Sequence, residues 1–304
     1  MARLSGTTTR PNTVIEPDRQ AASAVIDPRL WLLRLLPHHA ISRLTFWLAR
    51  RRTRLKAPLV RWFIRRYGVD MGEAAEPDPA AYASFNGFFT RALRPGARPL
   101  TGTDTTLIAP VDGRISQAGA IRAGTLFQAK GIDYAAADLL GSLEAFAPFH
   151  SGSFATLYLA PGDYHRIHMP LAGTLRHMTY VPGRLFSVAP WTVRSVPGLF
   201  TRNERVCAHF DTPYGRLAMV LVGAINVAAI ETVWAGLITP PRGRQIVEIP
   251  YTGQAAVTLP RGAEMGRFNM GSTVILLLER NVAWSPGTAP GERVRMGNAL
   301  AHLD

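Results

Sequence analysis

Short apolar segments rich in β-branched residues dominate the chain from about residue 86 onward, and Gly and Pro separate them at frequent intervals. Examples are TLIAPVDGRISQAG, FATLYLAPGDYHRIHMPLAGTL, GRLAMVLVGAINVAAIETVW and STVILLLE. Apolar runs bounded by turn residues are typical of strands. AAADLLGSLEAFAPF is the clearest helical interruption. The pattern therefore predicts an α+β, mainly β domain over residues 73–304.

Two of these segments share a spacing. APVDGRISQAG from Ala109 and MPLAGTLRHM from Met169 both have Pro, two residues, Gly, one residue, then Ile or Leu. Both are similar to the turn-and-strand entry of the barrel-sandwich units in lipoyl and biotinyl carrier domains. We therefore expect a duplicated barrel-sandwich (lipoyl-like) fold. No lysine occupies a carrier-type hairpin tip, which excludes the carrier function.

The segment before this domain has a different periodicity. In PRLWLLRLLPHHAISRLTFWLARRRTRLKAPLVRWFIRRYG, apolar residues recur at spacings of three and four. This pattern predicts basic amphipathic helices within residues 29–72, broken near Pro37 and Pro58. The Pro- and Ala-rich MGEAAEPDPAAYASF that follows indicates a connection, and residues 1–28 are expected to form a flexible tail.

Positive charge is concentrated in the same segment. The formal net charge is +13, and between Asp27 and Asp70 there are 11 Lys and Arg residues and no acidic residue. Without these 11 charges the net charge would be only +2. A nearly neutral main domain argues against a nucleic-acid groove distributed over it. We therefore expect no nucleic-acid partner.

Aromatic and aliphatic residues interleave with these basic residues, Trp31, Trp47 and Trp62 among them. Helices with one apolar and one basic face lie in membrane interfaces, where each basic residue adds about 1 kcal/mol of attraction to anionic headgroups. We therefore predict peripheral binding to an anionic membrane surface. Two other interpretations of this segment stay open. The helices could form a hairpin packed on their own domain with a solvated Arg face, or their aromatic residues could stack on single-stranded nucleic acid.

Cysteine content and the N-terminal sequence indicate a compartment. The single cysteine, Cys207, leaves no intramolecular disulfide and no cysteine cluster for a metal. The N-terminal MARLSGTTTRPNTVIEPDRQ lacks the apolar core of a signal peptide, and no apolar run has the length of a bilayer span. We expect a protein on the cytoplasmic face of the membrane, neither exported nor transmembrane.

Four residues have side chains suited to nucleophilic catalysis: Asp112 in PVDG, His165 and His168 in DYHRIHMP, and Ser272 in MGST. Each also has an ordinary explanation. Asp112 precedes a glycine and fits a turn carboxylate that caps its own backbone, and Ser272 fits a turn before a strand. No His-Glu-x-x-His motif or Cys pair completes a metal site, so no metal is expected.

Ordered blocks over residues 85–280 resemble the phosphatidylserine decarboxylases. They are FNGFFTRALRPGARPL, APVDGRISQAG, AKGIDYAAADLLG, YLAPGDYHRIHMPLAGTLRHMTYVPGRLFSV, LFTRNERVCAHFDTPYGRLAMVLVGA, IETVW and GAEMGRFNMGSTVILL. The basic N-terminal segment is similar only in character. The self-cleavage motif of the family, usually Leu-Gly-Ser-Thr, falls on residues 270–273, with Met270 as a volume-conserving change. Gly162 stands where Arg or Lys is frequent in relatives.

The resemblance implies both a maturation and a reaction. Asp112, His168 and Ser272 would form the maturation triad, and Ser272 would attack the carbonyl of Gly271. The products would be a β chain of residues 1–271 and an α chain of residues 272–304, in which Ser272 has become a pyruvoyl group. This covalent cofactor would form a Schiff base with phosphatidylserine and release CO2 to give phosphatidylethanolamine, with His165 in the proton-transfer role.

The resemblance also implies that both chains stay in one fold and that the processed protein is a homodimer. Two other functions remain open. A serine hydrolase could use the same trio on an external ester, although the Gly-x-Ser-x-Gly elbow is absent. A membrane-bound, lipoyl-like binding module would leave Ser272 as a turn residue. Both alternatives predict an uncleaved chain, and the decarboxylase predicts a cleaved one.

Overall fold

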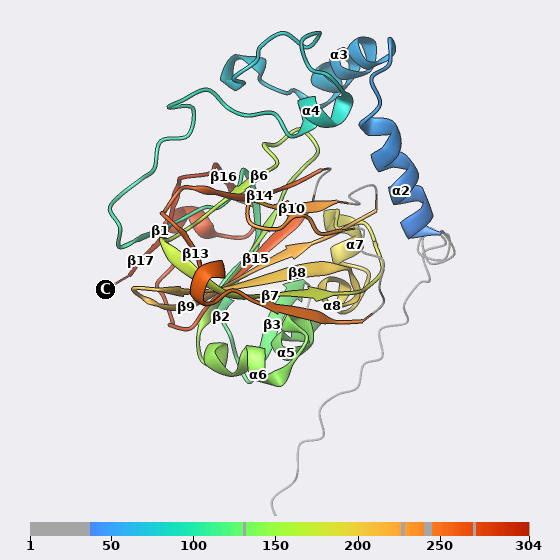
Figure 1. Cartoon of the computed structure of the whole chain (residues 1–304). Helices are drawn as coiled ribbons and strands as arrows, with labels where there is room; N and C mark the ends of the chain where they lie inside the picture. Colours follow the sequence, from blue (N-terminus) through green and yellow to red (C-terminus); the bar gives the residue numbers. More distant parts are fainter. Residues whose placement is uncertain (1–36, 130–131, 226–228, 240–244, 270–271, 304) are drawn as a thin grey trace, which may run out of the picture. The chain divides into compact units, whose positions relative to one another are not determined.

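The structure is a computed structural model, and it describes residues 37–303 except 130–131, 226–228, 240–244 and 270–271 (Figure 1). The predicted tail, Trp31 and the two residues before Ser272 lie outside the described residues. Within them the fold is α+β and mainly β, as the sequence predicts.

The largest sheet has nine strands in the order β12-β7-β8-β9-β15-β5-β2-β16, with β13 also paired to β7. All the pairs are antiparallel. The strands are β2 (Gly113–Ala120), β5 (Ser153–Tyr158), β7 (Gly173–Val181), β8 (Arg205–Thr212), β9 (Gly215–Val222), β12 (Val247–Pro250), β13 (Val257–Leu259), β15 (Thr273–Leu278) and β16 (Arg293–Val294).

Strand β15 lies at the centre of this sheet. All six of its residues are buried, and it pairs in unbroken register with β5 on one side and β9 on the other. A strand covered on both faces needs a continuous apolar run rather than an alternating one. STVILLLE has such a run, so the predicted strand is confirmed.

Smaller sheets and short helices surround this sheet. One sheet has the order β11-β10-β14-β6, and β1 pairs with β17 and β3 with β4. These strands are β1 (Thr106–Ile108), β3 (Thr125–Ala129), β4 (Ile132–Ala135), β6 (Arg166–His168), β10 (Ile230–Thr232), β11 (Gly236–Leu237), β14 (Glu264–Phe268) and β17 (Ala299–His302). The short helices are α5 (Ala136–Leu140), α6 (Leu143–Phe146), η2 (Ala147–Phe149), α7 (Pro190–Val193), α8 (Leu199–Arg202), η3 (Gly253–Ala255) and η4 (Pro286–Thr288). The helical interruption predicted in AAADLLGSLEAFAPF corresponds to α5, α6 and η2.

The two segments with shared spacing cross each other through reciprocal hydrogen bonds. Ile108 N donates to Pro170 O at 3.1 Å, and His168 N donates to Pro110 O at 2.8 Å. In each segment the donor precedes the proline by two residues, and β2 and β7 each begin at the glycine of their segment. The repeat in sequence is therefore also a repeat in hydrogen bonding. Assignment to the barrel-sandwich class stays a prediction.

The basic segment forms α2 (His38–Ala49) and α3 (Lys56–Tyr67), followed by η1 (Met71–Glu73) and α4 (Phe85–Phe89). The predicted break near Pro37 is confirmed, because α2 begins directly after it. The predicted break near Pro58 is confirmed as well, because the helical conformation is interrupted between the end of α2 at Ala49 and the start of α3 at Lys56. Pro58 is the third residue of α3, where the first-turn N–H has no intrahelical partner to lose.

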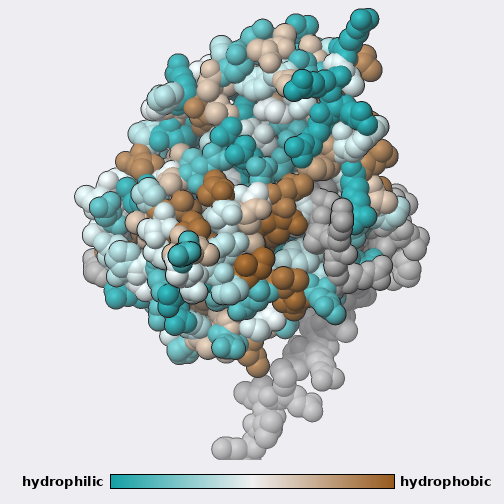
Figure 2. All heavy atoms as spheres, viewed as in Figure 1, coloured by the Kyte–Doolittle hydropathy of each residue, from teal (hydrophilic) through white to brown (hydrophobic). Residues whose placement is uncertain are grey.

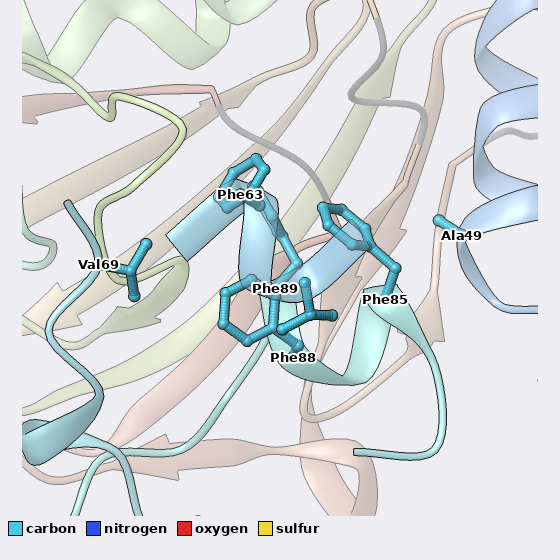
Figure 3. Packing of buried hydrophobic residues seen from close by; sticks show 7 residues of the cluster. Ala49, Phe63, Val69, Phe85, Phe88 and Phe89 are labelled. Atoms are coloured by element: carbon cyan, nitrogen blue, oxygen red, sulfur yellow. The ribbon is translucent and has the colours of Figure 1, made fainter. Parts of the chain in front are cut away.

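One face of α3 packs against α4. The Phe63 ring lies 5.3 Å from that of Phe85, 5.8 Å from Phe88 and 6.0 Å from Phe89, measured between centroids. The three α4 rings gather around Phe63, and Val69 and Ala49 belong to the same cluster (Figure 3). Such a cluster ties α3 to the body of the domain. One alternative for the basic segment was a helical hairpin packed on its own domain. Such packing is present on one face of the segment.

Exposed apolar side chains also lie on the two helices and at Leu55, the N-cap of α3. These side chains keep between 46% and 76% of their exposure: Leu44, Trp47, Leu48, Leu55, Leu59 and Trp62. Figure 2 shows hydrophobic residues lying among hydrophilic ones over the end of the molecule formed by α3 and α4. Within residues 37–303, outside the gaps, no helix has the length and hydropathy to cross a membrane.

Candidate active site

Asp112 lies in the turn between β1 and β2, with its carboxylate buried. Arg98 Nε donates to Oδ1 at 2.9 Å and Arg98 Nη2 donates to Oδ2 at 2.5 Å. Met296 N donates to Oδ1 at 2.8 Å. These partners of the Asp112 carboxylate lie 14 and 184 residues away in the sequence. They differ from the expected contact, in which the carboxylate caps its own turn. Such charge-assisted, bidentate contacts fix both oxygens of a carboxylate.

His168 ends β6, and its backbone donates to Pro110 O two residues before Asp112. Its ring Nδ1 lies 2.8 Å from Gly262 O, and its Nε2 lies 3.0 Å from the Tyr164 hydroxyl. Because a carbonyl only accepts, Nδ1 carries the proton in the neutral ring and Nε2 keeps its lone pair. Burial lowers the pKa of His168, and this effect outweighs the hydrogen bond to Gly262 and the charge of Asp112, which both raise the pKa. Nε2 is therefore the basic atom at neutral pH.

His165 is completely buried, three residues earlier on the same segment. Its Nε2 lies 3.2 Å from Pro161 O, whereas its Nδ1 is buried with no hydrogen-bond partner among the described residues. Burial lowers its pKa to about 3. The ring is therefore neutral, and its unpaired nitrogen is free to take part in proton transfer.

Ser272 directly precedes β15 and is completely buried. Its carbonyl accepts from Leu159 N at 2.9 Å, which joins the serine to the end of β5. Its hydroxyl has no hydrogen-bond partner within the described residues. A buried hydroxyl without a partner costs free energy, so its position before a central strand is unusual for a simple turn residue.

The structure brings Asp112 and His168 to neighbouring positions through the crossing of the two repeated segments. No hydrogen bond in the described part of the chain joins the side chains of Asp112, His168 and Ser272. Arg98 and Tyr164 occupy the positions next to the carboxylate and the imidazole instead. Across residues 37–303, outside the gaps, no three His, Cys, Asp or Glu side chains are grouped to hold a metal.

A pocket of about 360 Å³ lies beside Thr273, the residue after Ser272. Apolar residues such as Val193 and Phe200 line it together with Arg114 and Arg194. The Thr273 hydroxyl is buried without a partner among the described residues. A largely apolar cavity with a few polar groups is typical of a small-molecule site.

The departure at Gly162 also has a structural consequence. A Cβ at this position would lie 2.8 Å from Tyr67 O and 3.1 Å from Tyr67 Cβ, at the end of α3. Gly162 O in turn accepts from Arg91 Nη2 at 3.2 Å. The glycine therefore permits close contact between α3 and the loop that precedes His165.

Sequence reasoning missed Arg98, Tyr164 and Phe89 as parts of the site. Phe89 and Arg98 lie in FNGFFTRALRPGARPL and Tyr164 in DYHRIHMP, both segments that carry the family resemblance. Their place within those blocks was the available signal. Tyr164 contacts His168 across 4 residues, whereas the contacts of Arg98 with Asp112 and of Phe89 with His165 span 14 and 76 residues, which spacing alone does not reveal.

Comparisons with known proteins identify the family of the chain. The profile of the family described as phosphatidylserine decarboxylase matches residues 85–302, and a second profile, PSD, matches residues 28–68. A phosphatidylserine decarboxylase proenzyme of Shewanella denitrificans is 55% identical over 276 residues, covering 89% of this chain and 96% of the relative. One of Alkalilimnicola ehrlichii is 54% identical over 285 residues, covering 93% and 98%.

The fold and these similarities define the chain as a decarboxylase, an enzyme of the lyase class. The matched profile covers more than half of the chain and includes Asp112, His165, His168 and Ser272. The chain belongs to the phosphatidylserine decarboxylase family.

Proposed function

We propose that the chain is a proenzyme that cleaves itself between Gly271 and Ser272 and then converts phosphatidylserine to phosphatidylethanolamine and CO2. The observation that carries the proposal is the environment of Ser272. Its hydroxyl is buried without a described partner, immediately before a strand that is paired on both sides. Sheet pairing of β15 would hold the new chain end after the peptide bond is cut.

In this proposal His168 is the general base of maturation. Its neutral Nε2 takes the proton of the Ser272 hydroxyl, and the oxygen bonds to the Gly271 carbonyl carbon while the C–N bond to Ser272 breaks. The protonated His168 ring then gives this proton to the departing nitrogen, so the peptide bond becomes an ester and a free amine. The negative charge of Asp112 stabilises the protonated His168 ring. In agreement with this role, Asp112 raises the pKa of His168, whereas burial lowers it.

Removal of the Cα proton of Ser272 then expels the Gly271 carboxylate and leaves dehydroalanine. Addition of water and loss of ammonia convert it to a pyruvoyl group at the start of the α chain. The buried Ser272 oxygen, which has no partner among the described residues, and the neighbouring pocket fit this group. When present, the pyruvoyl ketone supplies a carbonyl for the substrate amine and an electron sink for loss of CO2.

His165 is assigned to proton transfer during turnover. Its Nδ1 has no hydrogen-bond partner among the described residues, and burial keeps the ring neutral, so the lone pair of Nδ1 is open to a proton. The pocket beside Thr273 is assigned to the phosphoserine headgroup, because Arg114 and Arg194 offer positive charge for the phosphate. The apolar remainder of the lining limits the entry of water.

The helices α2 and α3 are assigned to an anionic membrane surface on the cytoplasmic side. Their exposed tryptophans and leucines, together with arginines that carry no acidic counterparts between Asp27 and Asp70, support this assignment. The processed chains are proposed to remain together and to assemble as a homodimer.

The test is the intact mass of the purified protein under denaturing conditions, compared with Ser272→Ala. We expect two fragments that split after Gly271, with the smaller carrying a carbonyl that reacts with hydrazide, and an unbroken chain for Ser272→Ala. Ser285→Ala, a matched control in the same fragment, should cleave normally and lower the mass of that fragment by one oxygen atom. An unbroken, folded wild-type chain would contradict self-cleavage and favour a binding module or a hydrolase.

A further inference from the structure

The structure assigns a positioning role to Arg98: it holds the Asp112 carboxylate at the place from which Asp112 supports His168 during self-cleavage. This inference rests on the proposed maturation. Arg98 itself contacts neither Ser272 nor the His168 ring among its described hydrogen bonds, so it would act through Asp112. Neither the family similarity nor the sequence spacing assigns this role.

The contact between the two side chains is bidentate and buried. Arg98 Nε and Nη2 reach separate oxygens of Asp112, and the two side chains keep only 6% and 8% of their exposure. Water therefore has little access to either group, and rotation of the carboxylate would break two charge-assisted hydrogen bonds. Lysine has no planar fork and cannot reproduce this geometry.

The arginine is itself held from the other side. Arg98 Nη2 donates to Glu73 Oε2 at 2.8 Å, and Arg295 Nη1 donates to Glu73 Oε1 at 2.8 Å. Burial alone lowers the pKa of Arg98, but hydrogen bonds to Asp112 and Glu73 hold it above its ordinary value. The hydrogen bond from Arg98 lowers the pKa of Glu73. The charges thus alternate along one row: Asp112, Arg98, Glu73 and Arg295.

This row joins the two predicted products. Glu73, Arg98 and Asp112 precede the proposed cleavage point, whereas Arg295 and Met296 follow it. Met296 N completes the contact with Asp112 from the α-chain side. The position of the carboxylate is therefore set by groups on both sides of the bond that is cut.

The test follows self-cleavage over time after cell-free synthesis, where the 33.2 kDa chain is separated from its products. We expect Arg98→Met to slow cleavage at least tenfold and Arg98→Lys to slow it less. Guanidinium ion should partly restore Arg98→Met, because it can occupy the vacated fork. Glu73→Gln should slow cleavage several-fold. The matched control is Arg176→Met, which removes an exposed arginine paired with Asp211 at 2.9 Å and should leave the rate unchanged.

A double variant separates positioning from a general structural effect. If Arg98 acts through Asp112, Arg98→Met should add no further loss to Asp112→Asn. Near-UV circular dichroism checks folding, and Arg98→Lys decides the question if Arg98→Met does not fold. If the wild type cleaves and Arg98→Met or Arg98→Lys cleaves equally fast, the positioning role of Arg98 is wrong. The same holds if the two losses multiply in the double variant, and neither outcome contradicts the proposed function. Failure of the wild type to cleave would instead overturn the proposed function.

Discussion

The His165 ring stacks on the Phe89 ring, with centroids 4.1 Å apart and planes inclined by 19°. Phe89 belongs to α4, and α4 packs on α3 through Phe63. The same phenylalanine therefore covers a site histidine on one side and contacts the basic helical segment on the other. Helix α4 therefore contributes to the burial of His165.

Replacing Phe89 should change the ionisation of His165. Phe89→Ala removes one wall of the buried site, so the pKa of His165 should rise from about 3 toward its ordinary value near 6.5. The lost packing should also destabilise the fold by about 3–5 kcal/mol. The histidine ring signals in an NMR titration measure the first effect, and urea unfolding the second. Phe127→Ala, at a phenylalanine with 40% exposure, is the control and should change neither.

Acid should destabilise the proenzyme through buried histidines. Burial lowers the pKa of His165 and of His209 to about 3, with His177 and Arg216 contributing at His209. In the unfolded chain both bind a proton near pH 6.5, so stability is present above this pH and is lost as the pH falls toward 3. Each group adds a slope of up to about 1.4 kcal/mol per pH unit.

Urea unfolding of the Ser272→Ala proenzyme between pH 7 and pH 4 would measure this slope without cleavage. His209→Gln should make the curve shallower, whereas His302→Gln, at an exposed position, should leave it unchanged. An identical slope in His209→Gln would show that His209 does not contribute.

Much of the fold could be predicted because it depends on local pattern. The continuous apolar run of β15 needs burial on both faces, and the shared Pro-x-x-Gly spacing led to two strands that start at equivalent points. Pro58 shows the limit of such rules. A proline stops a helix in its interior but is tolerated in the first turn, and the boundary of α3 at Lys56 could not be read from the proline alone.

The site was less predictable than the strands. Family blocks led to Asp112, His168 and Ser272, but not to the groups that hold them. Arg98 reaches Asp112 through the path of an irregular connection, and Gly262 reaches His168 across 94 residues. Such contacts depend on how distant segments cross, so they leave no periodic signal in the sequence.

The exposed tryptophans of α2 and α3 should carry membrane binding. Trp47 and Trp62 each keep 51% of their exposure, whereas Phe63 is buried in the cluster with α4. Deleting the whole segment would expose that cluster, so a surface change is the sharper test. Trp47→Ser with Trp62→Ser should weaken sedimentation with phosphatidylserine-containing vesicles at least tenfold and leave folding intact. The pair Leu143→Ser and Leu237→Ser, on other exposed surfaces, should bind as the wild type does. Equal binding by both double variants would contradict the assignment of α2 and α3 to the membrane.

The pocket beside Thr273 should select its substrate by charge. Arg194 lines the pocket and is exposed, so Arg194→Glu can reverse the charge there without burying a new carboxylate. We expect normal self-cleavage, because Arg194 lies outside the row that holds Asp112. Decarboxylation of a soluble short-chain phosphatidylserine should show KM raised about tenfold with a smaller change in kcat, since the lost interaction is with a phosphate that does not react. Arg122→Glu makes the same change at an exposed arginine outside the pocket lining and should retain the wild-type KM. An unchanged KM in Arg194→Glu would place the phosphate elsewhere, while a loss of cleavage would show that this loop also supports maturation.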